Sequence, residues 1–421
     1  MVQLRDLLTE RKEPVRVTGG LGDWQPITIK FSGDVLPRDR AEAFKGAMFA
    51  AYPGDVVFSK IDARNGAVGL IPASIPKVVL TPEYPVMVPD LVRLRPAYLN
   101  YLLRAEHFRY DLQRQASGTS GRKRVTPEAF LNLTVPLPTL DEQDALVKAY
   151  EVALANAARQ EADAARIEQE SQRAFEEALG IAPRPPLPDR PAFIARFREV
   201  ERWSHEGVLR AITQPAHAKA KWPLMALGDL IDNLENGWSP QCLDHPAAPD
   251  RWGVLKVGAV SFGYFNQREN KELPAKLKPL PHYEVKAGDV IISRANVTRY
   301  VGACAFVAET RPKLMLCDKL FRVVFKANGC LDGRLLAAVM KLPTVREQVE
   351  TRLTGTSPTM KNISKPALLD LRFPVPDRKI QEALVDALDA GSKRTEIHRS
   401  DATLLRQRAW VAFEAALFEP H

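Results

Sequence analysis

The sequence predicts a mixed α/β (α+β) chain built as an internal repeat, with two similar strand-rich globules joined by two long antiparallel helices around a pseudo-twofold axis. Three observations predict this architecture. The block VTPEAFLNLTVPLPTLDEQDALV, which starts at Val125, reappears as ISKPALLDLRFPVPDRKIQEALV from Ile363, at a constant offset of 238 residues. Each block runs into a long proline-free segment with helical spacing, and each is preceded by short apolar runs and Gly-Asp turns.

Length and composition set the limits of this prediction. A chain of 421 residues exceeds what one hydrophobic core usually organises, so two or more domains are expected. Lys and Arg outnumber Asp and Glu, 59 to 51, which favours a polyanionic partner. We find no secretory signal after Met1 and no apolar run long enough to span a bilayer. We therefore expect a cytoplasmic protein without a membrane contact.

The cysteines predict reduced thiols. Cys242, Cys304, Cys317 and Cys330 include no close CxxC pair, which suits a reducing compartment. Cys242 and His245 have ligand-like spacing, but no second pair of comparable spacing follows nearby. The sequence therefore predicts no metal site.

The repeat also gives the predicted domain boundaries. The strand-like run YPGDVVFSK in the first half corresponds to VKAGDVIISR in the second, and a Gly-Thr-Ser loop precedes each copy of the repeated block. We take this loop as the junction at which each globule meets its helix. The predicted parts are a first globule over 1–140, a long helix over 141–180, a proline-rich linker over 181–221, a second globule over 222–378 and a second long helix over 379–421.

Two narrow apolar seams predict that the long helices pack on each other. A helix of 39 residues is about 58 Å long at 1.5 Å per residue. Coiling with a partner protein is the alternative use of the seams. Gly391 and His398 make the middle of the second seam less regular. The first helix carries a net charge of −6 and the second of zero. Because the whole chain carries +8, the remaining residues carry +14. Charge that attracts a polyanion therefore lies outside the helices.

The search for catalytic motifs finds little. SGTSGRK, from Ser117, has its glycines too close together for a Walker loop and leads into a strand. A nuclease-like PD…ExK pattern is formally present in Asp250, Glu269 and Lys271, in which carboxylates would hold Mg²⁺. Glu269 lies in a polar stretch without strand alternation, however, and the first half has no equivalent pattern.

The polar tips that follow the repeated strands are the best candidates for binding DNA. Arg, Lys and Asn side chains donate to phosphates and to base edges. The segments KIDARNG and RANVTR occupy the same place in the two halves with different residues, as expected if two similar scaffolds read two different sequences. Asn65-Gly66 could instead be a plain hairpin turn, and the basic run after Gly121 a solvated surface. The predicted DNA-binding residues are Lys60, Arg64, Asn65, Arg122, Lys123, Arg124, Arg294, Asn296, Arg299 and Lys361.

These residues resemble a known family, the specificity (S) subunits of type I restriction-modification systems, also called HsdS. The features that carry the resemblance are PGDVVFSKIDARNGAVG, the block GTSGRKRVTPEAFLNLTVPLPTLDEQ, its second-half counterpart and the long helix after each. The resemblance implies two target recognition domains and a subunit without catalytic residues. It also implies a bipartite address on double-stranded DNA for a methyltransferase (M) subunit that binds S-adenosylmethionine and for a restriction (R) subunit that uses ATP and Mg²⁺. No cofactor is expected in this chain.

Two other functions stay open at this point. The chain could be a specificity-like subunit or scaffold of another phage-defence complex, in which the helices matter and DNA does not. It could also be a stand-alone nuclease that uses Asp250, Glu269 and Lys271.

Overall fold

The computed structural model describes residues 1–16, 20–39, 47–115, 124–181, 194, 208–209, 221–355, 357 and 360–418. The chain divides into two compact units: unit 1 contains Met1–Asp163 and Ile397–His421, and unit 2 contains Ala164–Glu396. Each long helix, α4 (Leu140–Ala178) and α10 (Arg378–Phe418), therefore begins in one unit and ends in the other. The two helices each start one residue before the predicted segments 141–180 and 379–421.

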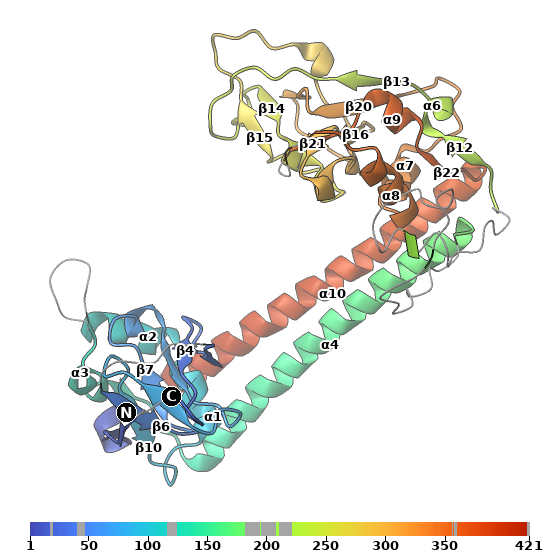
Figure 1. Cartoon of the computed structure of the whole chain (residues 1–421). Helices are drawn as coiled ribbons and strands as arrows, with labels where there is room; N and C mark the ends of the chain where they lie inside the picture. Colours follow the sequence, from blue (N-terminus) through green and yellow to red (C-terminus); the bar gives the residue numbers. More distant parts are fainter. Residues whose placement is uncertain are drawn as a thin grey trace. The chain divides into compact units, whose positions relative to one another are not determined.

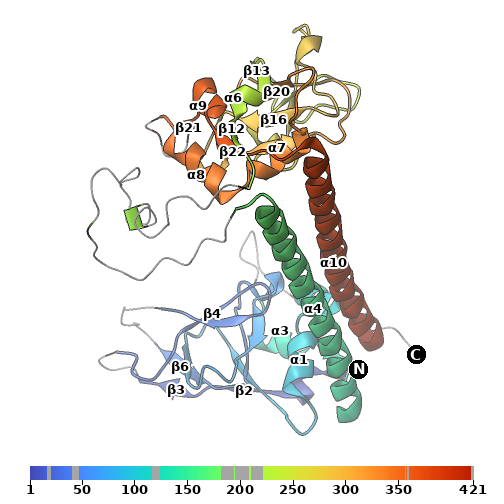
Figure 2. The same ribbon diagram turned by 90° about the vertical axis from the view of Figure 1, so that its right-hand side faces the viewer.

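Both units contain the same four-stranded antiparallel sheet (Figures 1 and 2). The strand order is β2-β10-β7-β8 in unit 1 and β13-β20-β16-β18 in unit 2. One central strand of each sheet, β10 or β20, is followed by equivalent elements: two short helices, a third short helix with a proline in its first turn, and a strand that leads into a long helix. The internal repeat that the sequence predicts is thus a repeat of one topology.

In the described residues of unit 1, three smaller sheets accompany this one: β1-β11, β3-β6-β9 and β4-β5. Its elements are β1 (Val2–Gln3), η1 (Leu4–Asp6), β2 (Leu8–Arg11), β3 (Pro14–Val15), β4 (Ile27–Ile29), β5 (Val35–Pro37), β6 (Met48–Ala51), β7 (Val56–Phe58), η2 (Ala63–Asn65), β8 (Val68–Leu70), β9 (Val78–Leu80), β10 (Val86–Pro89), α1 (Pro96–Leu102), α2 (Glu106–Gln115), α3 (Pro127–Leu131) and β11 (Thr134–Val135).

Unit 2 adds a different three-stranded sheet, β15-β14-β19, to the repeated part. Its elements are β12 (Leu224–Ala226), α6 (Leu227–Leu230), β13 (Ile231–Asn236), β14 (Gly253–Leu255), η4 (Val257–Ala259), β15 (Asn270–Glu272), η5 (Pro281–Tyr283), β16 (Val290–Ser293), β17 (Ala295–Asn296), η6 (Thr298–Tyr300), β18 (Cys304–Phe306), β19 (Leu314–Met315), β20 (Leu320–Phe325), α7 (Gly333–Val339), α8 (Pro343–Thr351), β21 (Lys361–Asn362), α9 (Lys365–Leu369) and β22 (Arg372–Pro374).

Each globule has two hydrophobic cores. One core lies between the repeated sheet and the short helices: it contains the stacked rings of Phe58 and Phe130, 4.3 Å apart, in unit 1 and Phe321 and Phe373 in unit 2. The other core belongs to the sheets that differ between the units. Each globule therefore consists of a repeated part and a part of its own.

The long helices pack on each other in antiparallel orientation, as the apolar seams predict. In unit 1 the first part of α4 lies beside the last part of α10 (Figure 1), where the ring of Tyr150 packs 5.6 Å from both Trp410 and Phe413. In unit 2 a Cβ added to Gly391 would lie 2.2 Å from the hydroxyl oxygen of Ser171, so the glycine permits a close approach there. The helix is continuous through Gly391, which serves the packing of the seam.

Within unit 1, two equivalent residues of the long helices contact each other. His398 Nδ1 is hydrogen-bonded to Oε1 of Gln160, and these two residues are separated by 238 positions, the offset of the repeat. The gap in the apolar seam that Gln160 and His398 create is therefore filled by their own polar contact.

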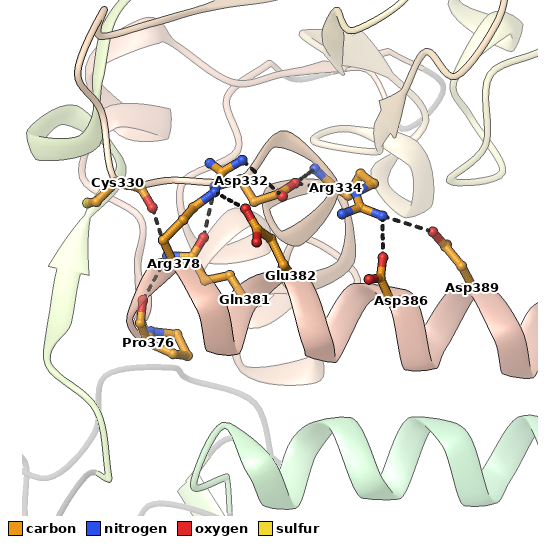
Figure 3. A network of polar contacts seen from close by, with 9 residues as sticks. All are labelled: Cys330, Asp332, Arg334, Pro376, Arg378, Gln381, Glu382, Asp386 and Asp389. Atoms are coloured by element: carbon orange, nitrogen blue, oxygen red, sulfur yellow. Dashed lines mark hydrogen bonds and ion pairs between the residues drawn. The ribbon is translucent and has the colours of Figure 1, made fainter.

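A buried glutamine joins each globule to its long helix. Gln143 and Gln381, which are equivalent in the repeat, both have 0% of their surface exposed. Gln381 Oε1 accepts from the backbone N–H of Asp332 at 2.8 Å, and its Nε2 donates to the carbonyls of Cys330 and Pro376 at 2.8 and 2.7 Å (Figure 3). The amide thus binds backbone groups of two segments, the one before α7 and the one before α10, and holds both at the start of the long helix.

Gln143 repeats the arrangement atom for atom in unit 1. Its Oε1 accepts from the N–H of Arg95 at 2.8 Å, and its Nε2 donates to the carbonyls of Arg93 and Pro138, both at 2.9 Å. Arg95 and Asp332 are the residues that directly precede the helices α1 and α7. Around Gln381, ion pairs of Arg334 with Asp386 and of Arg378 with Asp332 reinforce the same junction, as Figure 3 shows.

We predict that Gln381→Leu loosens α7 selectively. Each buried polar group that loses its partner costs about 1–3 kcal/mol, which corresponds to roughly tenfold or faster amide exchange in Asp332–Val339. Gln143→Leu should have the same effect on α1 and leave α7 unchanged. Hydrogen exchange followed by mass spectrometry measures both.

Lys379→Leu, at an exposed position in the first turn of α10, is the matched control and should leave both helices protected. Unchanged exchange in Gln381→Leu would contradict the anchoring role of the amide.

Candidate nucleic-acid interface

The two polar tips grow from equivalent strands of the repeated sheets. The first tip, Lys60–Gly66, connects β7 to β8, and the second tip, Arg294–Arg299, connects β16 to β18. The backbone N–H of Lys60 donates to the carbonyl of Glu83 at 3.0 Å, and that of Arg294 donates to the carbonyl of Lys319 at 2.9 Å. Lys60 and Arg294 thus occupy the same position, and both are basic.

The chain after each Gly-Thr-Ser loop returns to the tip. The N–H of Val125 donates to the carbonyl of Lys60 at 2.8 Å, and the N–H of Ile363 donates to the carbonyl of Arg294 at 3.0 Å. In unit 2 the strands β17 and β21 pair there, with Asn296 opposite Lys361. Residues far apart in sequence, Arg294, Asn296 and Lys361, are therefore brought together at one edge of the globule.

An arginine from the second short helix holds each tip. In unit 2, Arg346 of α8 donates to the carbonyls of Val301 at 2.6 Å and Arg299 at 3.2 Å, and burial lowers the pKa of its guanidinium. In unit 1, Arg109 of α2 reaches the carbonyl of Asn65 at 3.5 Å. The tips are consequently supported from behind by the repeated part of each globule.

The first tip is a turn that requires glycine. Gly66 has φ of +99°, and a Cβ added to it would lie 2.2 Å from the carbonyl oxygen of Phe31. Asn65 is exposed and its amide lies 3.4 Å from the carboxylate of Asp62. Arg64 and Lys60 are half-buried. The Asn65-Gly66 pair is thus part of a hairpin connection, and the same connection presents the polar side chains.

The basic side chain of Arg124 lies at the edge of the first tip. It pairs with Glu83 at 3.3 Å, and both side chains are about half exposed, with 51% and 44% of their surface accessible. Arg122 and Lys123 lie outside the described residues. The position of Glu83 in unit 1 is taken by Lys319 in unit 2, so the second tip has a base where the first has an acid.

The predicted DNA-binding residues of the second tip differ in the contacts that their side chains make within the protein. The guanidinium carbon of Arg294 lies 5.7 Å from the centre of the Phe321 ring. Asn296 is bonded at both ends of its amide, to Ser261 and to the N–H of Val297. Lys361 donates to the carbonyl of Gly355 at 2.6 Å. Asn296 therefore positions the tip, whereas Arg299 is exposed and lies 5.4 Å from the centre of the Tyr300 ring.

A basic hollow that the sequence did not predict adjoins the second tip. It has a volume of about 540 Å³ and is lined by Lys256, Lys271 and Lys319 together with Asp244 and other residues. Lys319 connects it directly to Arg294, because the carbonyl of Lys319 accepts the Arg294 N–H. Three bases converge here from different strands and loops, so no sequence spacing could have identified the hollow.

The residues of the nuclease pattern lie in or near this hollow and form separate contacts there. Lys271 pairs with Asp244 at 2.7 Å, which raises the pKa of the lysine, and Glu269 pairs with Lys256 at 2.8 Å. Asp250 lies in a turn, where its carbonyl accepts from Lys313. The expectation of no strand near Glu269 was wrong, because β15 begins at Asn270. Among the residues that the structure describes, no three His, Cys, Asp or Glu side chains form a group that could hold a metal ion.

The comparisons with known proteins find specificity subunits both by sequence and by fold. No family model matches the chain. Over 203 residues the chain is 28% identical to the Type I restriction enzyme EcoEI specificity subunit of Escherichia coli; this match covers 45% of the chain and 34% of that relative, so it spans about a third of the relative's length.

Solved structures match the whole chain at low identity. The crystal structure of the HsdS subunit from Thermoanaerobacter tengcongensis has a TM-score of 0.51 and 16% identity, with 99% of this chain and 96% of that chain covered. A chain from a structure on complex assembly and conformational transition of the type I R-M system has a TM-score of 0.59 at the same identity and coverage. The chain has the HsdS fold. The similarity to specificity subunits that the repeated blocks predict is found in part of the sequence and in the fold.

In the part of this HsdS-like chain that the structure describes, no helix has the length and apolar character needed to cross a membrane. The four cysteines are free thiols, and burial raises the pKa of Cys317 to about 11.

We predict that Lys319→Ala weakens DNA binding by the HsdS-like chain and makes it less sensitive to salt. Removal of one phosphate contact lowers the slope of log K against log salt by about 1. Titrations with labelled duplex DNA at several salt concentrations measure the slope. Lys326→Ala removes the same charge from a lysine that bonds the carbonyl of Asp229 outside the hollow, and it should leave the slope unchanged. Equal slopes in the two variants would contradict a role of the hollow in DNA binding.

Proposed function

We propose that this chain is the DNA-specificity subunit of a type I restriction-modification complex. It reads a bipartite site on double-stranded DNA and directs methyltransferase and restriction subunits to that site. The observation that carries the proposal is the repetition of one sheet with one tip in the same place, while the side chains of the two tips differ. A scaffold that repeats while its reading edge changes suits two different half-sites.

The chemistry of the tips supports a division of labour between phosphates and bases. The equivalent basic residues Lys60 and Arg294, together with the lysines of the hollow, supply positive charge that binds the DNA backbone regardless of sequence. Exposed donors and acceptors such as Asn65 can address base edges, which alone carry sequence information. The exchange of Glu83 for Lys319 between the units makes the two edges electrostatically different.

We propose further that the subunit itself is not catalytic and acts in the cytoplasm. S-adenosylmethionine, ATP and Mg²⁺ would be bound by the partner subunits, which perform the chemistry. The pairing of Glu269 with Lys256 and of Lys271 with Asp244 supports a subunit without catalysis, since two of the three candidate nuclease side chains already have charged partners.

The long helices are the proposed contact for the methyltransferase subunit. In unit 1 a hollow of about 330 Å³ lies between α4 and α10 and is lined by Tyr150, Leu405 and Phe413 among others. Val152 and Val411 expose 52% and 64% of their surface on the same helices. A scaffold of another phage-defence complex could bind its partner through the same hollow. The test of the proposed function must therefore measure DNA recognition.

The test compares the DNA sequences selected by the assembled complex from a random duplex library. We predict that Asn65→Ala relaxes one half of the selected site and Arg294→Ala weakens the other half. The loss of a base contact costs about 1–3 kcal/mol in discrimination.

Lys326→Ala should select the wild-type site. Selection without any sequence preference would contradict the proposal, and wild-type behaviour of both tip variants would favour the scaffold. Mg²⁺-dependent cleavage by this chain alone, lost in Glu269→Ala, would establish the nuclease instead.

A further inference from the structure

An exposed turn of aromatic side chains lies beside the second tip. In the segment Val260–Phe265, Phe262 and Tyr264 expose 63% and 59% of their surface on either side of Gly263, whose φ is +75°. Exposing two large rings to water is unfavourable, because each could bury 150–250 Å² of surface. Such a pair in a folded globule indicates a surface that a ligand covers.

The base of this turn is rigid. Ala259 and Val260 are fully buried, and the N–H of Asn266 donates to the carbonyl of Ala259 at 2.8 Å. Ser261 Oγ donates to the carbonyl of Val257 at 2.9 Å and accepts from Asn296 Nδ2 at 3.0 Å. The exposed rings are therefore held in place by the second tip itself.

A third ring completes the surface. Tyr300, in η6 of the second tip, meets Phe262 edge-on at 5.5 Å between ring centres, and Phe262 and Tyr264 are nearly parallel, at 24° and 6.2 Å. Arg346 fixes the backbone on both sides of Tyr300 through the carbonyls of Arg299 and Val301. We call Phe262, Tyr264 and Tyr300 the aromatic turn.

The charges around the aromatic turn select a polyanion. Residues 257–266 and 294–302 contain no Asp or Glu. The guanidinium of Arg299 lies 5.4 Å from the centre of the Tyr300 ring, and a Cβ on Gly263 would lie 2.6 Å from Cε of Lys341. Glu269, whose carboxylate lies beside Gly258, forms an ion pair with Lys256.

We propose that the aromatic turn stacks on bases of the DNA half-site read by unit 2 and unstacks the duplex there. The inference rests on the proposed function and deepens it. Every nucleobase has a π-face on which an aromatic ring can stack. The aromatic turn can therefore bind an opened base-pair step, while the neighbouring cations Arg299 and Lys341 bind its phosphates. The sequence of that step then matters through how easily it opens, which gives specificity without a hydrogen bond to the base.

The test uses the assembled complex and duplexes that contain its selected site, with 2-aminopurine replacing one base at a time. Wild type should raise the fluorescence at one or two adjacent positions of one half-site, because 2-aminopurine brightens when it is unstacked. Phe262→Ala/Tyr264→Ala should abolish this rise and weaken binding about 5- to 100-fold, as expected for lost stacking. Tyr264→Phe keeps the ring and should retain the signal.

Val92→Ala, which trims an 81% exposed side chain on unit 1, is the matched control and should behave as wild type. An unchanged rise in the double variant overturns the inference, as does a double variant that no longer assembles with the partner subunits, which would make the turn a protein-binding surface. Failure to select any site would refute the proposed function instead. Because the changed rings are mostly exposed, unaltered circular dichroism is expected.

Discussion

The buried amides of Gln143 and Gln381 set the constraint on which the rest of the structure depends. Each amide satisfies one backbone N–H and two carbonyls: two of these groups precede α1 or α7, and the third lies just before the long helix. A buried polar group without a partner is costly, so the helix start, the Pro-x-Pro strand and the entry to α1 or α7 converge in one geometry. The globule and its helix are thereby joined rigidly at the same point in both repeats.

A fixed junction leaves the opposite edge of each globule free to vary. The repeated cores around Phe58 and Phe321 carry the sheet and the supporting arginines, while the remaining cores of the two units consist of different sheets. Lys60 and Arg294 keep one basic position, but Glu83 and Lys319 reverse the charge next to it. Conserved support and changed chemistry at the edge are what two separate DNA addresses require.

The sequence predicted the elements that depend on local spacing and on the repeat. The long helices, their antiparallel pairing and the equivalence of Gln143 with Gln381 all follow from one offset and from helical periodicity. It also predicted which strand ends carry polar tips. Whether those side chains bind DNA stays a prediction, and Arg122 and Lys123 lie beyond the described residues.

The sequence could not predict what depends on pairing between distant segments. Lys319 meets Arg294, and Lys361 meets Asn296, through hydrogen bonds between strands whose register has no local signal. Lys271 was weighed as a nuclease residue because of its spacing from Glu269, yet it lies in a basic hollow opposite Asp244. The Gly-Thr-Ser loop was taken as the junction of globule and helix, but Val125 and Ile363, just after it, bond the tips, and the glutamines make the junction.

The central claim is that one fold, present twice in the chain, recognises two different DNA half-sites. Mapping of methylated positions in host DNA by long-read sequencing tests it most directly. The account predicts a motif of two different specific parts separated by a constant number of unspecified bases. A continuous motif, or two identical half-sites, would contradict it.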